Sequence, residues 1–401
     1  MSAEERALPA TGESNNRWHP LQALFRATGI DRKIDIRIGH AGTVRSGNDR
    51  PHLTITRPLR LLSRLLMRGD LGFAEGYMAG EWETNDLTTL FMAIGANESR
   101  SRIRQGILSE RIRERVRHAL RSNSRNGSRR NIAYHYDLSN DFYAQWLDPT
   151  MTYSSAVFEE PVTSLEDAQH LKYQRLLNAL NAQPGDHILE IGCGWGGFAE
   201  EAARRGCRVT GVTLSREQLA YARERMRKAG AEELVTLEFR DYRELTEQYD
   251  HIVSIEMFEA VGERYWPLYF NKLRECLRPG GTAALQIITI DKHAFEHYRR
   301  RTDFIQRYIF PGGMLPTTER LDQLAEDAGL GIEEKRFYGR DYARTLRAWH
   351  QAFDACMNEI SALGFDDRFR RMWKYYLSYC EAGFLLDRID LLQLTLSRPA
   401  Q

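Results

Sequence analysis

The sequence lacks long apolar runs and any strong excess of one charge. No stretch approaches the roughly 20 apolar residues that cross a bilayer, so no membrane-spanning helix is expected. The opening MSAEERALPATGESNN has neither the basic nor the apolar region of a signal peptide, and we expect a disordered tail over 1–16. The formal net charge is +1, so any basic binding surface must be local.

Paired cysteines are also missing. The five cysteines are scattered and form no CxxC pair, which argues against a metal site and against a disulfide framework. They stand at Cys193, Cys207, Cys276, Cys356 and Cys380. This usage fits a reducing, cytoplasmic setting.

What is present divides into three regions. In residues 17–97, the runs 33–39 and 52–58 alternate apolar and polar side chains, which predicts two half-buried strands. A leucine-rich helical pattern, PLRLLSRLLMRGD, follows and ends at a glycine. These signals indicate a small α+β domain.

Residues 98–130 change character, with eleven arginines against three acids. Apolar residues recur at steps of four or five, which predicts a basic amphipathic helix. They are Ile103, Ile107, Ile112, Val116 and Leu120. Two interpretations stay open: a solvated linker helix, or a helix that lies on anionic phospholipid.

From 131 to 401, short β-rich runs alternate with helical segments, which predicts a parallel, doubly wound sheet. The runs are 187–192, 208–214, 236–241, 251–257 and 282–290. The aromatic segments 344–360 and 368–392 are predicted to be helices packed on this sheet.

The strongest motif is LEIGCGWGGFAEEAARRG, in which a strand leads through a glycine-rich turn into a helix. A dinucleotide-binding fold usually carries an acid about 20 residues further on, but Thr213 occupies that region. Glu190 instead precedes the glycines, where a carboxylate suits a cationic sulfonium cofactor better than a pyrophosphate. Asp241 and Tyr242, at the end of the third strand, are placed to meet an adenine. A glycine turn that serves packing alone, or a nicotinamide site, remains the alternative.

Several motifs, in this order, resemble the cyclopropane-fatty-acyl-phospholipid synthases and the related mycolic-acid methyltransferases. They are HYDLSNDFYAQWLDPTMTYSSAVFE, LEIGCGWGGFA, VTLSREQ, MFEAVGERYW and YIFPGGMLP. The resemblance covers about 131–398, and GFAEGYMAGEW extends it to the N-terminal lipid-binding domain of the bacterial synthases. It implies an α/β fold: a Rossmann-like, seven-stranded class I methyltransferase domain with a helical cover, and a small N-terminal α+β domain.

The resemblance also implies S-adenosylmethionine as cofactor and assigns residues to it, with Gln218 in the place of the missing ribose-binding acid. The cofactor-binding positions are Tyr153, Ser154, Glu190, Gly192, Cys193, Gly194, Trp195, Gly196, Gly197, Thr213, Leu214, Ser215, Gln218, Asp241 and Tyr242.

Methylation of an alkene leaves a carbocation, which needs electron-rich rings nearby and a base that removes a proton. Aromatic residues cluster at 134–158 and near the C-terminus, although core packing is the favoured interpretation of such clusters taken alone. In the family the base is a bicarbonate ion, and the matching positions are Ser155, Glu259, Gln286, Ile288 and Tyr342.

Two of these family positions differ here, and so does Ala260, which follows Glu259. Ser155 replaces a cysteine, Gln286 replaces a histidine, and Ala260 replaces a histidine after MFE. Because glutamine cannot titrate near neutrality, the ion would be held differently or the base would be another group. Cys380 matches a family active-site cysteine, but a buried inert thiol is the favoured interpretation. His135 could hydrogen-bond near the pocket or serve structure alone.

The expected function is therefore that of a cyclopropane-fatty-acyl-phospholipid synthase, acting on a cis double bond in an unsaturated phospholipid. Two alternatives stay open: a methyltransferase that leaves a methyl branch or a methylene group, and a lipid-binding protein without catalysis. The expected partners are phospholipid and an anionic membrane surface on the cytoplasmic side of the inner membrane, with no nucleic acid. A homodimer is a further expectation.

Overall fold

The computed structural model describes residues 33–39, 50–96, 138–160 and 164–400. The expected tail over 1–16, the basic helix over 98–130 and His135 lie outside these residues. None of the helices within the described ranges combines the length and apolarity needed to cross a bilayer.

The N-terminal part is a small α+β unit, as the sequence pattern predicts. Its strands are β1 (Asp35–Ile38), β2 (His52–Ile55) and β3 (Trp82–Thr84), and its helices are α2 (Pro58–Arg68), α3 (Asp70–Met78) and α4 (Leu87–Gly95). Strand β2 pairs parallel with β1 and antiparallel with β3. Helix α2 begins with a proline in its first turn and stops at Gly69, whose φ of 56° suits glycine.

The large domain is built on a seven-stranded sheet with the order β6-β5-β4-β7-β8-β10-β9. The strands are β4 (His187–Ile191), β5 (Arg208–Thr213), β6 (Val235–Phe239), β7 (Tyr249–Ile255), β8 (Leu277–Ile290), β9 (Gly331–Phe337) and β10 (Ile389–Ser397). The helices are α7 (Asn140–Ala144), α8 (Leu165–Ala179), α9 (Gly197–Arg204), α10 (Arg216–Ala229), α11 (Trp266–Cys276), α12 (Lys292–Arg299), α13 (Thr318–Asp327), α14 (Gly339–Ala355), α15 (Met357–Ala362) and α16 (Asp367–Leu385). Short single turns are η4 (Tyr242–Glu244), η5 (Phe258–Ala260), η6 (Glu263–Tyr265) and η7 (Ile305–Ile309).

The five neighbouring strands β6, β5, β4, β7 and β8 run parallel to one another, which confirms the doubly wound sheet. Strand β10 is inserted antiparallel between β8 and β9. The dinucleotide-binding sheet has six strands in the order 3-2-1-4-5-6 and no such insertion. The topology is that of a class I methyltransferase.

The expectation of helix across 368–392 is wrong in its last part. Helix α16 ends at Leu385, Asp387 adopts a left-handed φ of 53°, and β10 begins at Ile389. Strand β10 reads IDLLQLTLS, and the predicted helix covers only its first four residues, Ile389 to Leu392. These four residues show no alternation, which begins only beyond the predicted helix, where Leu394 and Leu396 alternate with Gln393 and Thr395.

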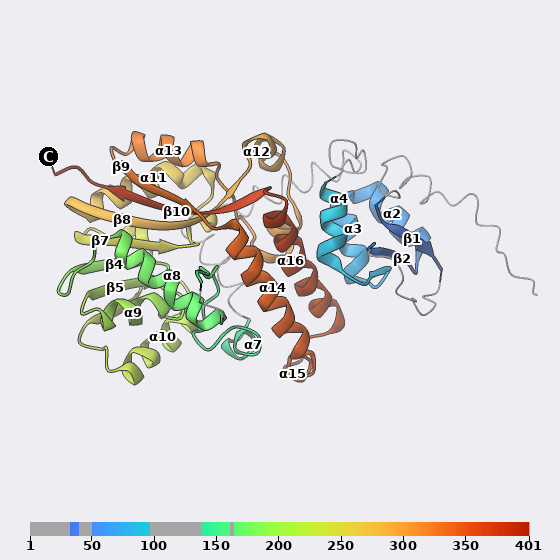
Figure 1. Ribbon diagram of the computed structural model, residues 1–401, viewed down its shortest axis with the longest axis horizontal. Coiled ribbons are helices and arrows are strands. Elements are labelled where there is room, and N and C mark those ends of the chain that lie inside the picture. Colours follow the sequence, from blue (N-terminus) through green and yellow to red (C-terminus); the bar gives the residue numbers. More distant parts are fainter. Residues whose placement is uncertain (1–32, 40–49, 97–137, 161–163, 401) are drawn as a thin grey trace, which may run out of the picture.

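The helices lie in layers around the sheet (Figure 1). Helices α8, α9 and α10 lie on one side and α11 and α13 on the other, while α14 and α16 stand between the sheet and the N-terminal unit. That unit packs directly on α16. The buried Glu381 carboxylate accepts from the Thr88 hydroxyl at 2.8 Å and from Arg347 Nε at 2.8 Å. Arg371 of α16 donates to the backbone carbonyls of Tyr77 and Trp82.

Candidate active site

The glycine-rich turn lies between β4 and α9, where the motif predicts it. Gly192, Gly194 and Gly196 have φ values of 88°, 51° and 83°, a region that favours glycine. A Cβ on Gly192 would lie 2.9 Å from Met257 Cγ, and one on Gly197 would lie 2.6 Å from the Tyr173 hydroxyl. The turn is therefore fixed both by its backbone conformation and by close packing.

Two predicted residues within this turn serve mainly to hold it. Cys193 is buried, and its amide donates to the Val212 carbonyl of β5 at 3.1 Å. The indole of Trp195 is also buried and donates to Asn140 Oδ1 of α7 at 2.7 Å. The turn is thus joined to α7.

Glu190 is the buried anionic group of this turn. Its Oε2 atom is buried and has no hydrogen-bond partner among the described residues. Burial raises the pKa of Glu190 to about 8, against the attraction of Arg225 and Lys172. An unpaired buried carboxylate oxygen beside a glycine turn fits a cationic cofactor such as S-adenosylmethionine.

The next strand contributes the second group of predicted cofactor residues. Thr213 ends β5, and its hydroxyl donates to Gln218 Oε1 at 3.4 Å. Ser215 caps α10 by accepting from the Gln218 amide at 3.2 Å, and Leu214 lies between them. The pairing of β5 with β4 places this corner beside the glycine turn.

Asp241 and Tyr242 follow β6, as expected. The Asp241 carboxylate is buried and accepts from Arg243 Nε at 2.8 Å and Nη2 at 2.6 Å. Tyr242 packs edge-on against Tyr269, with ring centroids 5.3 Å apart. Part of the hydrogen-bonding capacity of Asp241 is therefore used within the protein.

The segment from Tyr153 to Ser155 connects the cofactor side to the rest of the site. The Tyr153 hydroxyl donates to the Tyr376 hydroxyl at 2.8 Å. Ser154 is fixed by α8, because its hydroxyl accepts from Lys172 Nζ at 2.6 Å and its carbonyl accepts from Gln169 Nε2 at 2.9 Å.

Lys172 is a residue that the sequence analysis missed. Its side chain is fully buried, it also donates to Gln169 Oε1 at 2.7 Å, and burial lowers its pKa to about 7. A lysine three positions after a glutamine on an otherwise ordinary helix gives little signal in one sequence.

A second acidic group, here called the acidic centre, is formed by Glu256 and Glu259 near the ends of β7 and β8. Glu259 Oε1 accepts from the Ile288 amide at 2.6 Å, while its Oε2 is buried without a hydrogen-bond partner among the described residues. Burial raises the pKa of Glu259 to about 8, and the neighbouring Glu256 adds to the shift. Two carboxylates in one buried region cannot both ionise freely.

Glu256 was not predicted, yet it joins three of the predicted residues. Its Oε1 accepts from the Ser155 amide and from Gln286 Nε2, both at 2.8 Å, and its Oε2 accepts from the Tyr342 hydroxyl at 2.5 Å. The available signal was an acid at the end of an apolar strand, three residues before Glu259.

Aromatic rings surround Tyr153, and the two sequence clusters of aromatic residues meet here. Its ring centroid lies 5.3 Å from those of Tyr143 and Trp349 and 5.6 Å from that of Trp146. The helices α7, α14 and α16 supply most of the cluster, which also includes Trp373 and Phe310.

Cys380 packs against this aromatic core from α16. Burial raises the pKa of its thiol, which favours the protonated form.

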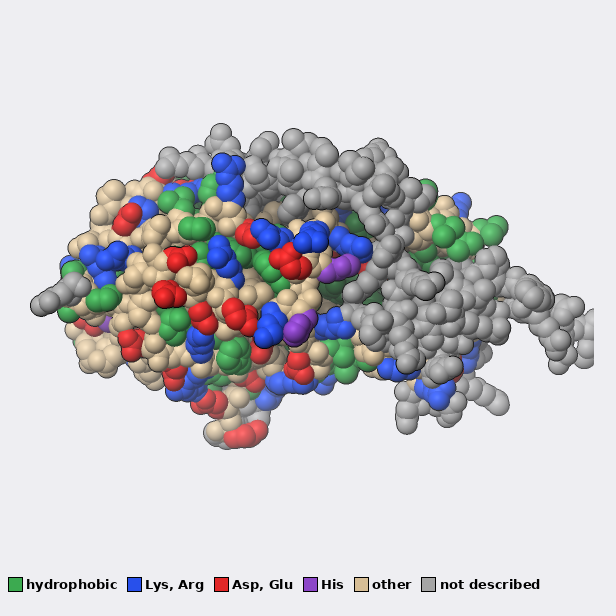
Figure 2. Space-filling model, turned by 90° about the horizontal axis from the view of Figure 1, so that it is seen from above, with side chains coloured by type: hydrophobic (Ala, Val, Ile, Leu, Met, Phe, Trp, Pro, Cys, Tyr) green, Lys and Arg blue, Asp and Glu red, His purple; other side chains and the backbone are tan. Residues whose placement is uncertain are grey.

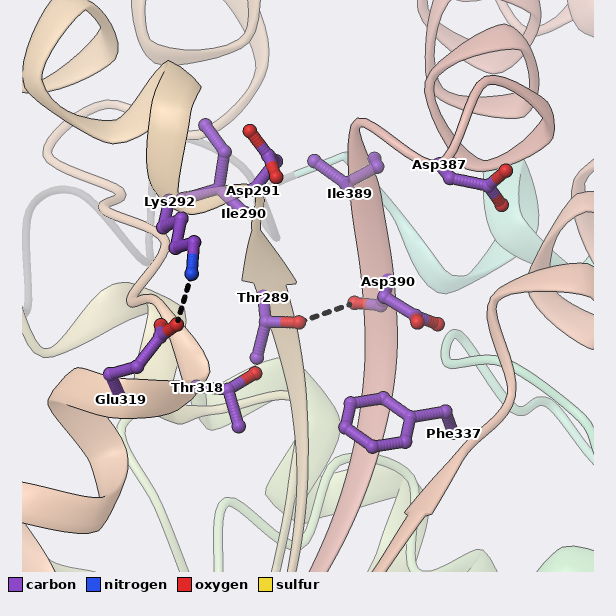
Figure 3. A pocket seen from close by; sticks show the side chains of 10 residues that line it. All are labelled: Thr289, Ile290, Asp291, Lys292, Thr318, Glu319, Phe337, Asp387, Ile389 and Asp390. Atoms are coloured by element: carbon purple, nitrogen blue, oxygen red, sulfur yellow. Dashed lines mark hydrogen bonds and ion pairs between the residues drawn. The ribbon is translucent and has the colours of Figure 1, made fainter.

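A separate, open depression lies at the outer ends of β8 and β10 (Figure 3). Its lining is mostly polar, with Lys292 paired to Glu319 at 3.7 Å and Asp390 accepting from Thr289 through its carbonyl. None of the predicted cofactor or catalytic residues lines it, so the candidate site lies elsewhere.

The sheet order, the glycine turn and the buried Glu190 define a class I methyltransferase that uses S-adenosylmethionine. The chain matches the family described as mycolic acid cyclopropane synthetase over residues 123–394. It therefore belongs to this family and is an S-adenosylmethionine-dependent methyltransferase of the cyclopropane synthase type.

Individual relatives agree with this assignment. Tuberculostearic acid methyltransferase UfaA1 of Mycobacterium tuberculosis is 43% identical over 99% of both chains. Cyclopropane-fatty-acyl-phospholipid synthase of Escherichia coli K12 is 34% identical over 90% of this chain and 91% of that one. The solved structure of the cyclopropane synthase MmaA2 from Mycobacterium tuberculosis is 32% identical, with a TM-score of 0.63 over 67% of this chain and 98% of that one. A solved complex of mycolic acid cyclopropane synthase CmaA1 with SAH is 30% identical, with the same TM-score and coverage.

Proposed function

We propose that the protein transfers the methyl group of S-adenosylmethionine to a cis double bond in an acyl chain of a phospholipid. Loss of a proton from the added methyl then closes a cyclopropane ring. The observation that carries this proposal is the segment from Tyr153 to Ser155. Tyr153 lies in the aromatic cluster, Ser154 accepts a hydrogen bond from Lys172, and the amide of Ser155 donates to Glu256 in the acidic centre.

Each part of the site has a task in this reaction. When bound, S-adenosylmethionine supplies an electrophilic methyl group. Glu190 holds the cofactor through its charge, and the rings around Tyr153 exclude water and stabilise a cation on the acyl chain through their electron-rich faces. The carboxylates of Glu256 and Glu259 lie where a proton can be accepted.

The test is incubation with labelled S-adenosylmethionine and vesicles of dioleoylphosphatidylglycerol, followed by mass spectrometry of the fatty acids. We expect labelled acyl chains that have gained one CH2 group. Absence of label from the lipid, with the cofactor bound, would contradict the proposal.

A methylene product is a second candidate. It is favoured by Gln286 and Ser155, which depart from the family pattern, and by the higher identity to a relative named as a methyltransferase than to one named for cyclopropane formation. It would require a hydride shift before proton loss, and a saturated methyl branch would require a later reduction by a hydride donor. Ring and methylene have the same mass, but ozonolysis cleaves only the methylene, to a ketone.

We also propose that the enzyme reaches its substrate by lying on an anionic bilayer. Helix α2 exposes Leu59, Leu66 and Met67, with exposed fractions of 75%, 56% and 43%, beside the exposed Arg60. Apolar side chains gather at this end of the molecule, while acidic and basic side chains are mixed over the visible face of the large domain (Figure 2). An apolar helix face flanked by arginines suits the lipid interface.

Replacing Leu59 and Leu66 with aspartate should weaken binding to anionic vesicles. Burying one leucine contributes about 1.5–3 kcal/mol, so each change should cost roughly tenfold or more in affinity. Vesicle sedimentation measures this. Leu363→Asp, at a leucine exposed to 41% beside α15, is the matched control. An equal loss in the control, or no loss in the double variant, would remove α2 from the membrane contact.

A further inference from the structure

The acidic centre already contains a carboxylate at the place where the family resemblance puts bicarbonate. Of the five residues that the resemblance assigns to the ion, Ser155, Gln286 and Tyr342 donate to the side chain of Glu256. The Ile288 amide donates to Glu259 instead.

The donors have little capacity left for a second anion. One N–H of the Gln286 amide donates to Glu256 at 2.8 Å and the other to the Ser155 carbonyl at 3.3 Å, while its oxygen accepts from Gln393 at 2.9 Å. The Ser155 hydroxyl donates to the Ala156 carbonyl at 2.9 Å. Of the polar side-chain atoms in this set, Glu259 Oε2 alone is buried without a hydrogen-bond partner among the described residues.

Charge argues in the same direction. Bicarbonate would add a further negative charge beside Glu256 and Glu259, where burial and then the repulsion of Glu256 already raise the pKa of Glu259. A free bicarbonate ion therefore does not fit the residues present.

The backbone of Glu256 adopts an unfavourable conformation. Its φ of 50° lies in the left-handed region, which few residues other than glycine adopt. Its amide is fixed by the Gln286 carbonyl at 2.8 Å. Strain of this kind persists where the surrounding structure determines it, and it concentrates at functional sites.

We propose that the side chain of Glu256 replaces bicarbonate as the catalytic base. This inference rests on the proposed alkene methylation. A C–H bond of the transferred methyl breaks, its proton goes to the Glu256 carboxylate, and the electron pair of that bond closes the ring or, after a hydride shift, forms the exocyclic double bond. The proton then passes to solvent, so that no further reactant is needed.

Within this site, Tyr342 and Gln286 are positioning residues. They hold the two carboxylate oxygens in fixed places. Among the described residues, Oε2 accepts from Tyr342 alone and so retains a lone pair for the proton. Burial raises the pKa of Glu256, which increases its affinity for a proton.

The experiment compares the wild type with Glu256→Gln and Glu256→Gly, in buffer depleted of bicarbonate and in buffer supplied with it. We expect wild-type activity to be independent of bicarbonate. Both variants should lose activity roughly 100-fold or more in depleted buffer, as expected for loss of a general base. Only Glu256→Gly, which frees the three donors and leaves room, should regain activity with bicarbonate.

Binding provides a second readout. Bicarbonate should raise the melting temperature of Glu256→Gly and leave that of the wild type unchanged. Glu233→Gly, at an exposed glutamate in a loop, is the control for the substitution itself. Bicarbonate-dependent activity or bicarbonate binding in the wild type, or full activity of Glu256→Gln in depleted buffer, would overturn the proposal. If the wild type labels no lipid at all, the proposed function fails, while the melting measurement still decides whether Glu256 fills the site.

Discussion

Replacing Glu190 with glutamine should lower the affinity for S-adenosylmethionine about 10- to 100-fold, since hydrogen bonds to charged groups contribute about 1.5–3 kcal/mol. The glutamine keeps the size of the side chain but removes the charge that a cationic cofactor requires. Oε2 of Glu190 is buried without a hydrogen-bond partner among the described residues, so the same change removes an unfavourable buried charge from the ligand-free protein. Affinity and ligand-free stability should therefore move in opposite directions.

The pH dependence of both effects follows from the raised pKa of Glu190, which is about 8 against an ordinary value of 4.5. The folded protein holds this proton more tightly than the unfolded chain. The contribution to stability is thus fully present below pH 4.5 and is lost as the pH rises through about 8. The melting temperature of ligand-free Glu190→Gln should exceed that of the wild type most clearly above this range.

Cofactor binding should release a proton from Glu190, because a bound cation favours the carboxylate form. Calorimetry near neutral pH in buffers with different heats of ionisation measures the number released, which should be larger for the wild type than for Glu190→Gln. Glu233→Gln, at an exposed glutamate, should match the wild type in every measurement. Equal cofactor affinity in the wild type and Glu190→Gln would remove Glu190 from the cofactor site.

The sequence predicted those strands and helices whose own residues form a recognisable pattern. The runs at 187–192 and 208–214 became β4 and β5, because β-rich segments followed by helical ones imply a parallel sheet. The start of strand β10 was assigned to the preceding helix because its first four residues, Ile389 to Leu392, show no alternation. Its position between β8 and β9 depends on pairing across the whole domain, which periodicity does not record.

The residues of the candidate site were likewise predictable only in part. Glu190 could be identified because a strand, a glycine turn and a helix surround it in sequence. Glu256 could not, since its partners come from segments far apart: the amide of Ser155 lies 101 residues before it, and the hydroxyl of Tyr342 lies 86 residues after it. The partners of Lys172, Gln169 and Ser154, are close in sequence, but the burial that makes this lysine unusual arises from packing that one sequence does not show. A carboxylate that takes the place of an external ion is visible only when its donors are seen around it.

Replacing Lys172 with methionine should weaken cofactor binding roughly tenfold near neutral pH, the effect of one unit of pKa. The Lys172 ammonium attracts the carboxylates of Glu190 and Glu256, so its loss raises the pKa of both and leaves less of the charged form of Glu190. Ser154 and Gln169 also lose a donor, which should lower the stability of the fold by about 1–3 kcal/mol.

The affinity difference should close as the pH rises. Burial lowers the pKa of Lys172 to about 7, so the wild-type lysine itself becomes neutral above this value, while the carboxylates of the variant ionise. Calorimetric affinities measured from neutral to alkaline pH test this. The control is Lys228→Met, at a lysine whose side chain is exposed to 71%. An affinity loss in Lys172→Met that stays constant with pH would show that Lys172 acts only by packing the segment around Ser154, because only an electrostatic contribution disappears when the lysine loses its proton.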